Sequence, residues 1–530
     1  MATALAVLLG ATSTAFAGEL LATDVSAGDA VDRRCAERKL SAGAGFAQQR
    51  VTMPAAGAVT ARLNAARGDW DLAIFDADSG RVVAGSAYSG SDEVASGFAT
   101  SGERLVVQAC RLSGDSASAG VTVESTALDL TNVAKTSLVR VSTPTAARKQ
   151  ELVDLGLDVT EHGGPGYLEV VLHGAEDAEK LVQHAFMYTL EVPDLSVQAR
   201  NDRQADLAFA ASTDRSELPS GRTTYRLLAD YSAEMKQLVH DHPGLARSIT
   251  LKSKTYEGRP VEGIEIATNP DARDGRPVFL QMGVHHAREW PSSEHAMEWA
   301  YELIKGYRSG DARITQLVQN TRTIIVPVVN PDGFNQSREA GQLYMHGDGA
   351  GTDLDGSGDI SDEEFILAAA AAPNEYKRKN CRFLSDANGG SCLQPDTGII
   401  GPGVDPNRNY GGFWGGAGAS ATPLNQTYRG PGPFSEPETQ NVRELISSRQ
   451  VTALITNHTF SNLVLRPPGI AIQGETPDEP LYKALGDAMA AHNGYASQFG
   501  YQLYDTTGTT EDWSYYATGG FGFTFEIGDL

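Results

Sequence analysis

The stretch Val278-Phe-Leu-Gln-Met-Gly-Val-His-His-Ala-Arg-Glu-Trp290 decides how this chain is interpreted. It opens with a short apolar run, which predicts a buried strand, and a glycine ends the run. Directly past this strand stand His286, Arg288 and Glu289. A histidine and a carboxylate three residues apart can bind one metal ion. The same pair arises easily by chance at an ordinary strand end, so the other parts of a site have to be found elsewhere in the chain.

A second histidine, His458, stands in a like position, because it follows the apolar run Val451-Thr-Ala-Leu-Ile-Thr456 and one asparagine. From Tyr225 onward, apolar strands alternate with amphipathic helices such as Tyr231–Asp241 and Ser292–Tyr307. This alternation predicts an α/β fold with a mixed or parallel central sheet and helices on both faces. Ligands bind beyond the carboxyl ends of the strands in such folds, which is where the two histidines are expected.

His286, Glu289 and His458 together supply two imidazoles, one carboxylate and an open fourth position, the ligand set of a hydrolytic zinc. The surrounding motifs resemble the zinc carboxypeptidases of the funnelin family, the carboxypeptidase A and B type. In chain order, the matching motifs are Gly283-Val-His-His-Ala-Arg-Glu-Trp290, Asn330-Pro-Asp-Gly-Phe334, Arg378-Lys-Asn380, Gly403-Val-Asp-Pro-Asn-Arg-Asn409, Asn457-His458, Tyr504, Asp512-Trp-Ser-Tyr515 and Phe523-Thr-Phe-Glu526.

The resemblance implies zinc as the cofactor and assigns a ligand role to individual residues. His286, Glu289 and His458 would hold one Zn²⁺. The ligand is assigned to His286 rather than to His285, because His285 lacks a glutamate three residues on. Asp405 would accept the other ring proton of His286 and so fix its tautomer.

The resemblance also assigns the residues that act on the peptide bond. Glu526, on the apolar strand Gly522-Phe-Thr-Phe525, would be the general base that takes a proton from water and passes it to the leaving amine. Arg378 would stabilise the oxyanion. Asn407 and Arg408 would bind the free C-terminal carboxylate of the substrate, since a guanidinium fits a carboxylate through two hydrogen bonds.

Further positions concern the choice of substrate. Arg288 would lie along the path of the substrate carboxylate, and Tyr504 matches a mobile tyrosine that closes over the substrate. Glu511 falls where basic-specific members of the family carry an acidic group, so it would attract a terminal Lys or Arg. The same pocket would be lined by Gly469, Thr506 and Thr524. We therefore predict that both hydrophobic and basic terminal residues are accepted.

Upstream segments predict export and two further units. Residues 1–18 end in Thr14-Ala-Phe-Ala-Gly18, which fits a secretory signal cleaved after Ala17, although a basic start is absent. Short strands between Gly, Ser and Asp turns predict a β-sandwich over residues 27–130. Its stretch Asp69-Trp-Asp-Leu-Ala-Ile-Phe-Asp76 resembles the pre-peptidase C-terminal type of domain, which accompanies secreted peptidases. We expect this unit to have a binding or folding role.

Residues 137–197 predict a βαββαβ unit of the ferredoxin-like kind, which is similar in topology to the inhibitory pro-domain of the carboxypeptidases. The polar residues 201–224 predict a protease-accessible linker. The catalytic domain would then span residues 225–530. The chain stops four residues after Glu526, whereas family members continue further, so the C-terminal end is expected to be incomplete or unusually packed.

One insertion departs from the family pattern. Asp353-Leu-Asp-Gly-Ser-Gly-Asp-Ile-Ser-Asp-Glu-Glu364 fits an EF-hand type of calcium loop, and the alternative is a flexible acidic loop. A structural Ca²⁺ there would brace the segment that delivers Arg378. Its ligands would come from Asp353, Asp355, Ser357, Asp359, Ser361 and Glu364.

Composition and charge bound the possible partners. A formal net charge of −24 disfavours nucleic acid and anionic membranes, both of which would repel the chain. No segment past the leader is apolar enough to span a bilayer. We expect a monomer that acts on peptide or protein C-termini. Four cysteines allow three connectivities, and the local pairs Cys35–Cys110 and Cys381–Cys392 are the natural choice in an exported protein.

The sequence therefore predicts a secreted zinc metallocarboxypeptidase made with a pro-like segment. One alternative within the enzymes is a relative that acts on cell-wall peptides or other amide conjugates, and Arg408 and Tyr504 favour ordinary peptide C-termini instead. A second alternative is a non-catalytic binding or adhesion protein in which the site survives only as structure. Against it, every metal, base and carboxylate-binding position is filled.

Overall fold

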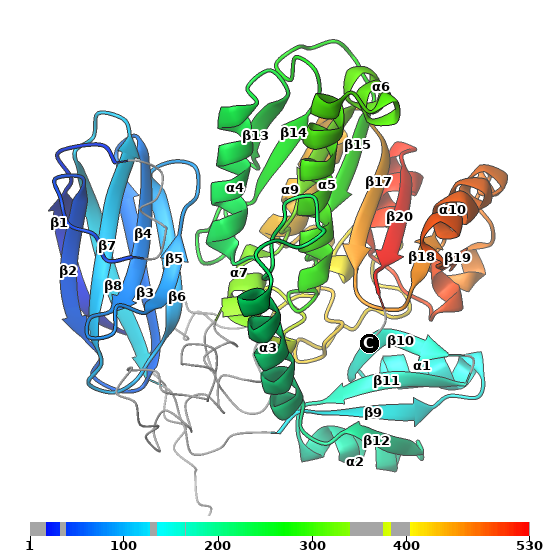
Figure 1. Ribbon diagram of the computed structural model, residues 1–530. Coiled ribbons are helices and arrows are strands. Elements are labelled where there is room, and N and C mark those ends of the chain that lie inside the picture. Colours follow the sequence, from blue (N-terminus) through cyan, green and yellow to red (C-terminus); the bar gives the residue numbers. More distant parts are fainter. Residues whose placement is uncertain are drawn as a thin grey trace, which may run out of the picture.

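The computed structural model describes residues 17–31, 39–127, 135–164, 166–339, 375–382 and 403–528. Figure 1 shows three parts, which we call the N-terminal module, the small unit and the large domain. The N-terminal module is all β, the small unit is α+β, and the large domain is α/β.

The N-terminal module consists of two four-stranded antiparallel sheets, with strand orders β1-β8-β3-β6 and β2-β7-β4-β5. Both sheets contribute to one apolar core, in which Trp70 and Val59 are fully buried. Its strands are β1 (Ala17–Ser26), β2 (Phe46–Thr52), β3 (Gly57–Ala65), β4 (Asp69–Asp76), β5 (Val82–Ser86), β6 (Asp92–Ala99), β7 (Arg104–Ser113) and β8 (Ser118–Ala127). The predicted start at residue 27 was wrong, because β1 precedes it and pairs with β8 along its whole length.

The small unit follows the predicted order of elements. They are β9 (Ser137–Ser142), α1 (Ala146–Asp154), β10 (Asp158–Gly164), β11 (Tyr167–Leu172), α2 (Ala175–Gln183) and β12 (Tyr188–Val192). Its antiparallel sheet has the order β10-β11-β9-β12. Helix α1 begins after Thr145, whose side chain accepts a hydrogen bond from the Arg148 backbone at 3.2 Å and so caps the helix.

The linker predicted from residue 201 is helical in its first half. Helix α3 spans Leu195–Ser212, because Ala, Leu, Gln and Arg in this polar segment are good helix formers. Residues 213–227 form neither helix nor strand. Figure 1 shows α3 running from the small unit toward the large domain.

The large domain has an eight-stranded mixed sheet with the order β13-β14-β16-β15-β17-β20-β18-β19. The strands are β13 (Ala246–Thr250), β14 (Glu262–Ile266), β15 (Val278–Met282), β16 (Arg322–Val326), β17 (Val451–His458), β18 (Leu463–Arg466), β19 (Ala496–Phe499) and β20 (Phe521–Glu526). The predicted mixed sheet is confirmed. Its central strands β16, β15, β17 and β20 are parallel to one another.

Helices cover both faces of this sheet. The α-helices are α4 (Leu228–Asp241), α5 (Trp290–Ser309), α6 (Ala312–Asn320), α7 (Pro331–Phe334), α9 (Pro437–Ser448), α10 (Glu479–Asn493) and α11 (Thr510–Trp513). Short 3-10 or π turns span Asn335–Glu339, Pro406–Arg408, Ala471–Gln473, Gly500–Gln502 and Ser514–Thr518. Helices α4, α5 and α6 share one apolar core with the sheet, and α9 packs on the opposite face. Successive side chains of β16 point to opposite faces of the sheet, so both faces are apolar. Ile324 packs in the core with α9, and Ile325 packs in the core with α4, α5 and α6.

The parallel centre of the sheet brings three strand ends to one edge. In the register, Met282 of β15 is opposite Thr456 of β17, and His458 at the end of β17 is opposite Glu526 at the end of β20. Side chains far apart in sequence therefore meet beyond these carboxyl ends, as the fold class predicts.

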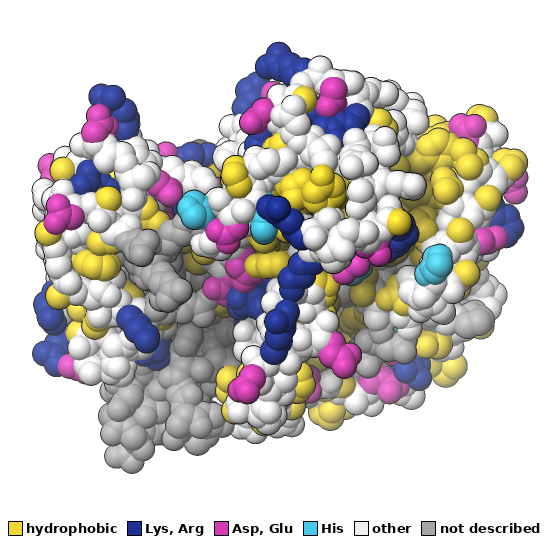
Figure 2. All heavy atoms as spheres, turned by 45° about the horizontal axis from the view of Figure 1, so that its top comes forward, with side chains coloured by type: hydrophobic (Ala, Val, Ile, Leu, Met, Phe, Trp, Pro, Cys, Tyr) yellow, Lys and Arg dark blue, Asp and Glu magenta, His cyan; other side chains and the backbone are white. Residues whose placement is uncertain are grey.

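Several predictions fall outside the described residues. These are the calcium loop of residues 353–364, most of the predicted leader, and Cys35 and Cys392. Cys110 and Cys381 each take part in a disulfide bond. Which cysteine each of them pairs with stays a prediction. Within the described ranges, no helix combines the length and apolar character needed to cross a membrane. Figure 2 shows acidic and basic side chains dispersed over one face of the molecule.

Candidate active site

The chain turns sharply after β15. Val284 has φ of 49°, in the left-handed region that a β-branched residue rarely adopts. Its backbone N–H donates to Ser292 Oγ at 2.8 Å, and its carbonyl accepts from the Asn330 N–H at 3.0 Å. These two bonds hold the strained turn, and the turn directs His285 and His286 into different surroundings.

Three buried side chains converge beyond the strand ends: His286, Glu289 and His458, each 1% exposed. His286 Nδ1 lies 2.7 Å from Glu289 Oε1, and His458 Nδ1 lies 2.8 Å from Glu289 Oε2. The two Nδ1 atoms are 3.2 Å apart. All three potential ligand atoms therefore surround one point, as the sequence predicts.

This geometry fits a zinc ion. Ligands at about 2.0–2.1 Å from a tetrahedral Zn²⁺ stand about 3.3 Å from one another, so the shortest separation of 2.7 Å needs to widen by about 0.6 Å. Glu289 Oε2 is buried and lacks a hydrogen bond of good geometry, although it lies 2.8 Å from His458 Nδ1. An orphaned carboxylate oxygen beside two imidazole nitrogens is a donor set that suits zinc.

His285 does not belong to this group. Its Nε2 lies 2.9 Å from Tyr410 Oη, and its Nδ1 lies 3.1 Å from Thr456 Oγ1. Burial, followed by the neighbouring His458 and His286, holds the pKa of His285 well below its usual value. It is a neutral core histidine, which agrees with the assignment of the ligand to His286.

Asp405 links the ligand group to an arginine. One carboxylate oxygen lies 3.1 Å from His286 Nε2, and the other accepts from Arg378 Nε at 2.9 Å. The Asn407 backbone N–H also donates to Asp405 at 2.9 Å, at the start of the 3-10 turn. Burial alone would raise the pKa of Asp405, but Arg378 and His286 hold it well below its usual range. A permanently ionised Asp405 thus orients both side chains.

Glu526 lies beside the ligand group on the next strand, 3% exposed. Its Oε2 has no hydrogen-bond partner in the described part of the chain. Burial, together with the nearby Glu161 and Glu289, raises the pKa of Glu526 well above its usual value. A raised pKa makes the ionised carboxylate a stronger base toward water.

Two carboxylates of the small unit reach into the site. Asp158 on β10 accepts from Arg288 Nη1 at 2.5 Å and from Nη2 at 2.9 Å. Glu161 on the same strand accepts from Arg378 Nη1 at 2.7 Å, while Arg378 Nη2 has no partner among the described residues. Sequence reasoning missed both contacts. The available signal was two acidic residues three apart in the sequence, which does not identify partners so distant in the chain.

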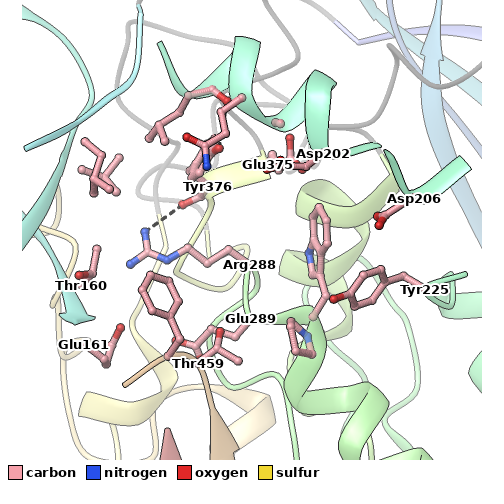
Figure 3. A pocket seen from close by; sticks show the side chains of 18 residues that line it. Thr160, Glu161, Asp202, Asp206, Tyr225, Arg288, Glu289, Glu375, Tyr376 and Thr459 are labelled. Carbon is pink, nitrogen blue, oxygen red and sulfur yellow. Dashed lines mark hydrogen bonds between the residues drawn. The ribbon is translucent and has the colours of Figure 1, made fainter. Parts of the chain in front are cut away.

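A cavity of about 410 Å³ remains between the small unit, α3 and the large domain. Figure 3 shows the Arg288 side chain crossing it, with Thr160 and Glu161 on one side and Tyr225 on the other. The dashed line in Figure 3 joins Arg288 Nη1 to the Tyr376 carbonyl at 3.3 Å. Arg288 is therefore held in place from both the small unit and the large domain.

The predicted carboxylate-binding residues lie in the 3-10 turn and next to it. Asn407 Oδ1 accepts from the Thr510 N–H at 3.1 Å, which ties the turn to α11. Arg408 is 3% exposed and donates from Nε to the Gly418 carbonyl at 2.9 Å and from Nη1 to the Asn407 carbonyl at 2.9 Å. Both residues are therefore fixed by backbone contacts.

Tyr504 and Glu511 are buried near these groups. Tyr504 packs in an apolar cluster with Leu503 and with core residues of the small unit such as Val139. Glu511, at 5% exposure, lies on α11, and its Oε2 has no hydrogen-bond partner within the described ranges. The hydroxyls of Thr506 and Thr524 are likewise buried and without a partner there.

The comparisons with known proteins agree with this site. The zinc carboxypeptidase family model matches residues 231–530. Carboxypeptidase A1 of Rattus norvegicus is 26% identical over 389 residues, which cover 71% of this chain and 80% of the rat protein. Carboxypeptidase A1 of Mus musculus is 28% identical over 360 residues, with coverage of 66% and 73%. The crystal structure of carboxypeptidase A from Helicoverpa armigera resembles the fold with a TM-score of 0.58 at 21% identity, over 75% of this chain and 90% of that one.

The chain belongs to the zinc carboxypeptidase family, peptidase family M14. It is a metallocarboxypeptidase hydrolase with carboxypeptidase A-like homologues, and peptides are the substrates that its family implies. Zinc is implied both by the family and by the group His286, Glu289 and His458.

Replacing one of the two adjacent histidines tests the ligand assignment. We expect His286→Gln to lower zinc affinity by more than about 100-fold, since loss of an outer partner of a ligand alone costs about 10–100-fold. The matched variant His285→Gln should keep the wild-type zinc stoichiometry and lose only thermal stability. Equilibrium dialysis with metal analysis measures the first effect, and calorimetry measures the second. Equal loss of zinc in both variants would contradict the assignment.

Proposed function

We propose that this metallocarboxypeptidase is an exopeptidase that removes the C-terminal residue of peptides and proteins. The observation that carries the proposal is Arg408, whose buried guanidinium donates to two backbone carbonyls and forms no ion pair with the described residues. A buried cation without a counter-ion is unfavourable. The free carboxylate of a substrate would supply that counter-ion, because arginine binds carboxylates through two parallel hydrogen bonds.

The proposed mechanism uses the residues around this anchor. Bound Zn²⁺ would polarise the scissile carbonyl and lower the pKa of water at the site. Glu526 would take a proton from that water and deliver it to the leaving amine, which suits a carboxyl group with a raised pKa. Arg378, with one unpartnered nitrogen, would donate to the oxyanion. Asn407 would bind the substrate carboxylate beside Arg408, Arg288 would lie along its path, and Tyr504 would close over the substrate.

We further propose that basic as well as hydrophobic terminal residues are accepted. The support is Glu511, a buried carboxylate with one oxygen unpartnered among the described residues. Gly522 makes room for it, since a side chain at that position would come within 2.9 Å of the Glu511 Cβ. A terminal Lys or Arg would pair with Glu511, and the space at Gly469, Thr506 and Thr524 would accommodate large side chains.

We propose that the small unit is an inhibitory pro-segment. Its Asp158 forms an ion pair with Arg288, which is proposed to lie along the path of the substrate. Its Glu161 forms an ion pair with Arg378, which is proposed to stabilise the oxyanion. Activation would require cleavage within residues 213–219, where Arg215 is exposed. The new N-terminal segment of the large domain would stay bound to α5 after the cut. Ser220 donates to Glu298 from its N–H at 2.7 Å and from its hydroxyl at 2.6 Å.

Export to the extracellular space completes the proposal. The leader pattern ending at Gly18 supports it. Strand β1 begins at Ala17, so cleavage after that residue would leave nearly all of β1 in the mature protein. The N-terminal module, which resembles a pre-peptidase C-terminal type of domain at residues 69–76, would accompany the enzyme.

The first test of the function removes the general base. Glu526→Gln should keep bound zinc but lose about 10²–10⁴-fold in kcat, the usual contribution of a positioned base. Mass spectrometry of a short peptide should show loss of one C-terminal residue with the wild-type protein. The same peptide with an amidated C-terminus should survive. Cleavage of internal bonds, or equal cleavage of the amidated peptide, would contradict the exopeptidase proposal.

The second test concerns terminal-residue preference. Glu511→Gln should lower kcat/KM for peptides ending in Lys by about 10–100-fold, because it removes a charge-assisted hydrogen bond worth about 1.5–3 kcal/mol. Peptides ending in Phe should be cleaved as before. The exposed control Glu475→Gln should change neither rate. An unchanged Lys preference in Glu511→Gln would rule out this role.

The third test concerns inhibition. In the uncut chain, Glu161→Gln should raise kcat/KM toward a small peptide by about 10–100-fold, because it weakens the charge-assisted bond to Arg378. The matched control Glu179→Gln, on the exposed side of α2, should leave the low activity of the uncut chain unchanged. If the uncut wild-type chain is already as active as the large domain freed of the small unit, the small unit is not inhibitory.

A further inference from the structure

The N-terminal module contacts the large domain directly. Tyr88, in the loop between β5 and β6, is 3% exposed and packs in the apolar core that α4 and α5 form on the sheet. Ser89 N–H donates to Glu262 on β14 at 2.9 Å. Figure 1 places the module next to α4. Part of the apolar core of the large domain is thus completed by the module.

A lysine of α4 forms a charged contact between the two parts. Lys236 Nζ donates to Asp69 at 3.0 Å and to the Tyr88 carbonyl at 2.6 Å, and it lies 3.7 Å from Asp71. Burial raises the pKa of Asp71 to about 7, against the opposing effect of Lys236. The lysine is therefore the cation that compensates a buried carboxylate of the module.

A buried arginine forms another polar contact between the two parts. Arg259, fully buried, pairs with Glu257 and with Asp332 of the large domain and also donates to Ser96 of the module at 3.1 Å. Arg62 of the module donates to the Glu257 carbonyl. The network therefore continues across the boundary, and separation of the two parts would open it to water.

The order of the chain gives this contact a consequence. The small unit lies between the module and residues 213–227 in sequence, so one cut within 213–219 leaves it covalently attached to the module. Residues 128–136 make that connection between β8 and β9. A short connection between two bound parts gives an effective concentration on the order of millimolar. The small unit would then stay over the site after a single cut.

We propose that the N-terminal module is a permanent, non-covalently held subunit of the mature enzyme. Activation then takes two cuts, one within residues 213–219 and one between β8 and β9. The first cut separates the large domain from the rest of the chain, and the second frees the small unit from the module. This inference rests on the proposed function, namely inhibition by the small unit.

Two engineered cleavage sites in the full chain test the proposal, one for a first specific protease within residues 213–219 and one for a second protease within 128–134. After the first cut alone, both fragments should co-elute in size-exclusion chromatography and activity should stay at the level of the uncut chain. After both cuts, the small unit should separate and activity should rise by about 10²-fold or more, the gain that tethering typically gives. The module should still co-elute with the large domain.

Variants at the boundary sharpen the test. Lys236→Ala combined with Arg62→Ala should let the N-terminal fragment dissociate after the first cut alone, and activity should then rise without the second cut. The control Lys252→Ala, whose exposed side chain pairs with Glu444 within the large domain, should behave as wild type.

The outcomes separate the two proposals. Separation of the wild-type module from the large domain after both cuts would overturn the permanent association. Full activity after the first cut alone would overturn the need for a second. Full activity of the uncut chain would instead overturn inhibition by the small unit, and co-elution of the module would still decide whether it is a bound subunit.

Discussion

The carboxylate of Asp405 is the group on which the arrangement of the site depends. It contacts the ring of a zinc ligand, His286, through one oxygen and the guanidinium of Arg378 through the other. Because Asp405 starts the 3-10 turn that carries Asn407 and Arg408, the orientation of the metal ligand and of the carboxylate-binding residues has one origin. Buried charges that orient each other in this way keep their geometry, since moving one leaves another uncompensated.

Charge compensation also explains the place of the small unit. The large domain presents Arg288, Arg378 and Arg408 around the ligand group, and the small unit pairs with the first two through Asp158 and Glu161. Arg408 pairs with no carboxylate of the described residues. The small unit thus pairs with two cations of the site and leaves Arg408 for another anion. The carboxylates of Asp158 and Glu161 on β10 thus take the place of negatively charged groups of a substrate.

Much of the fold could be predicted from local pattern. The βαββαβ order and the strand Val278–Met282 follow from hydrophobic periodicity, which is a property of neighbouring residues. The ligand group was predictable because two histidines follow two apolar strands. Contacts such as Arg288 with Asp158 were not, because a single sequence contains no signal for pairs of charges 130 residues apart. Helix α3 was missed because a polar segment without an apolar stripe has too little periodicity to distinguish a helix from a linker.

The pairing of β17 with β20 has a consequence for how this family can vary. His458 and Glu526 are register partners at the ends of two adjacent parallel strands. Side chains alternate between the two faces of a sheet, so insertion or deletion of one residue in either strand would turn one of the two to the opposite face. We therefore expect length changes to be tolerated in loops, such as the long connection between Phe334 and Arg378. The lengths of β17 and β20 are thus fixed by the need to keep His458 and Glu526 on the same side of the sheet.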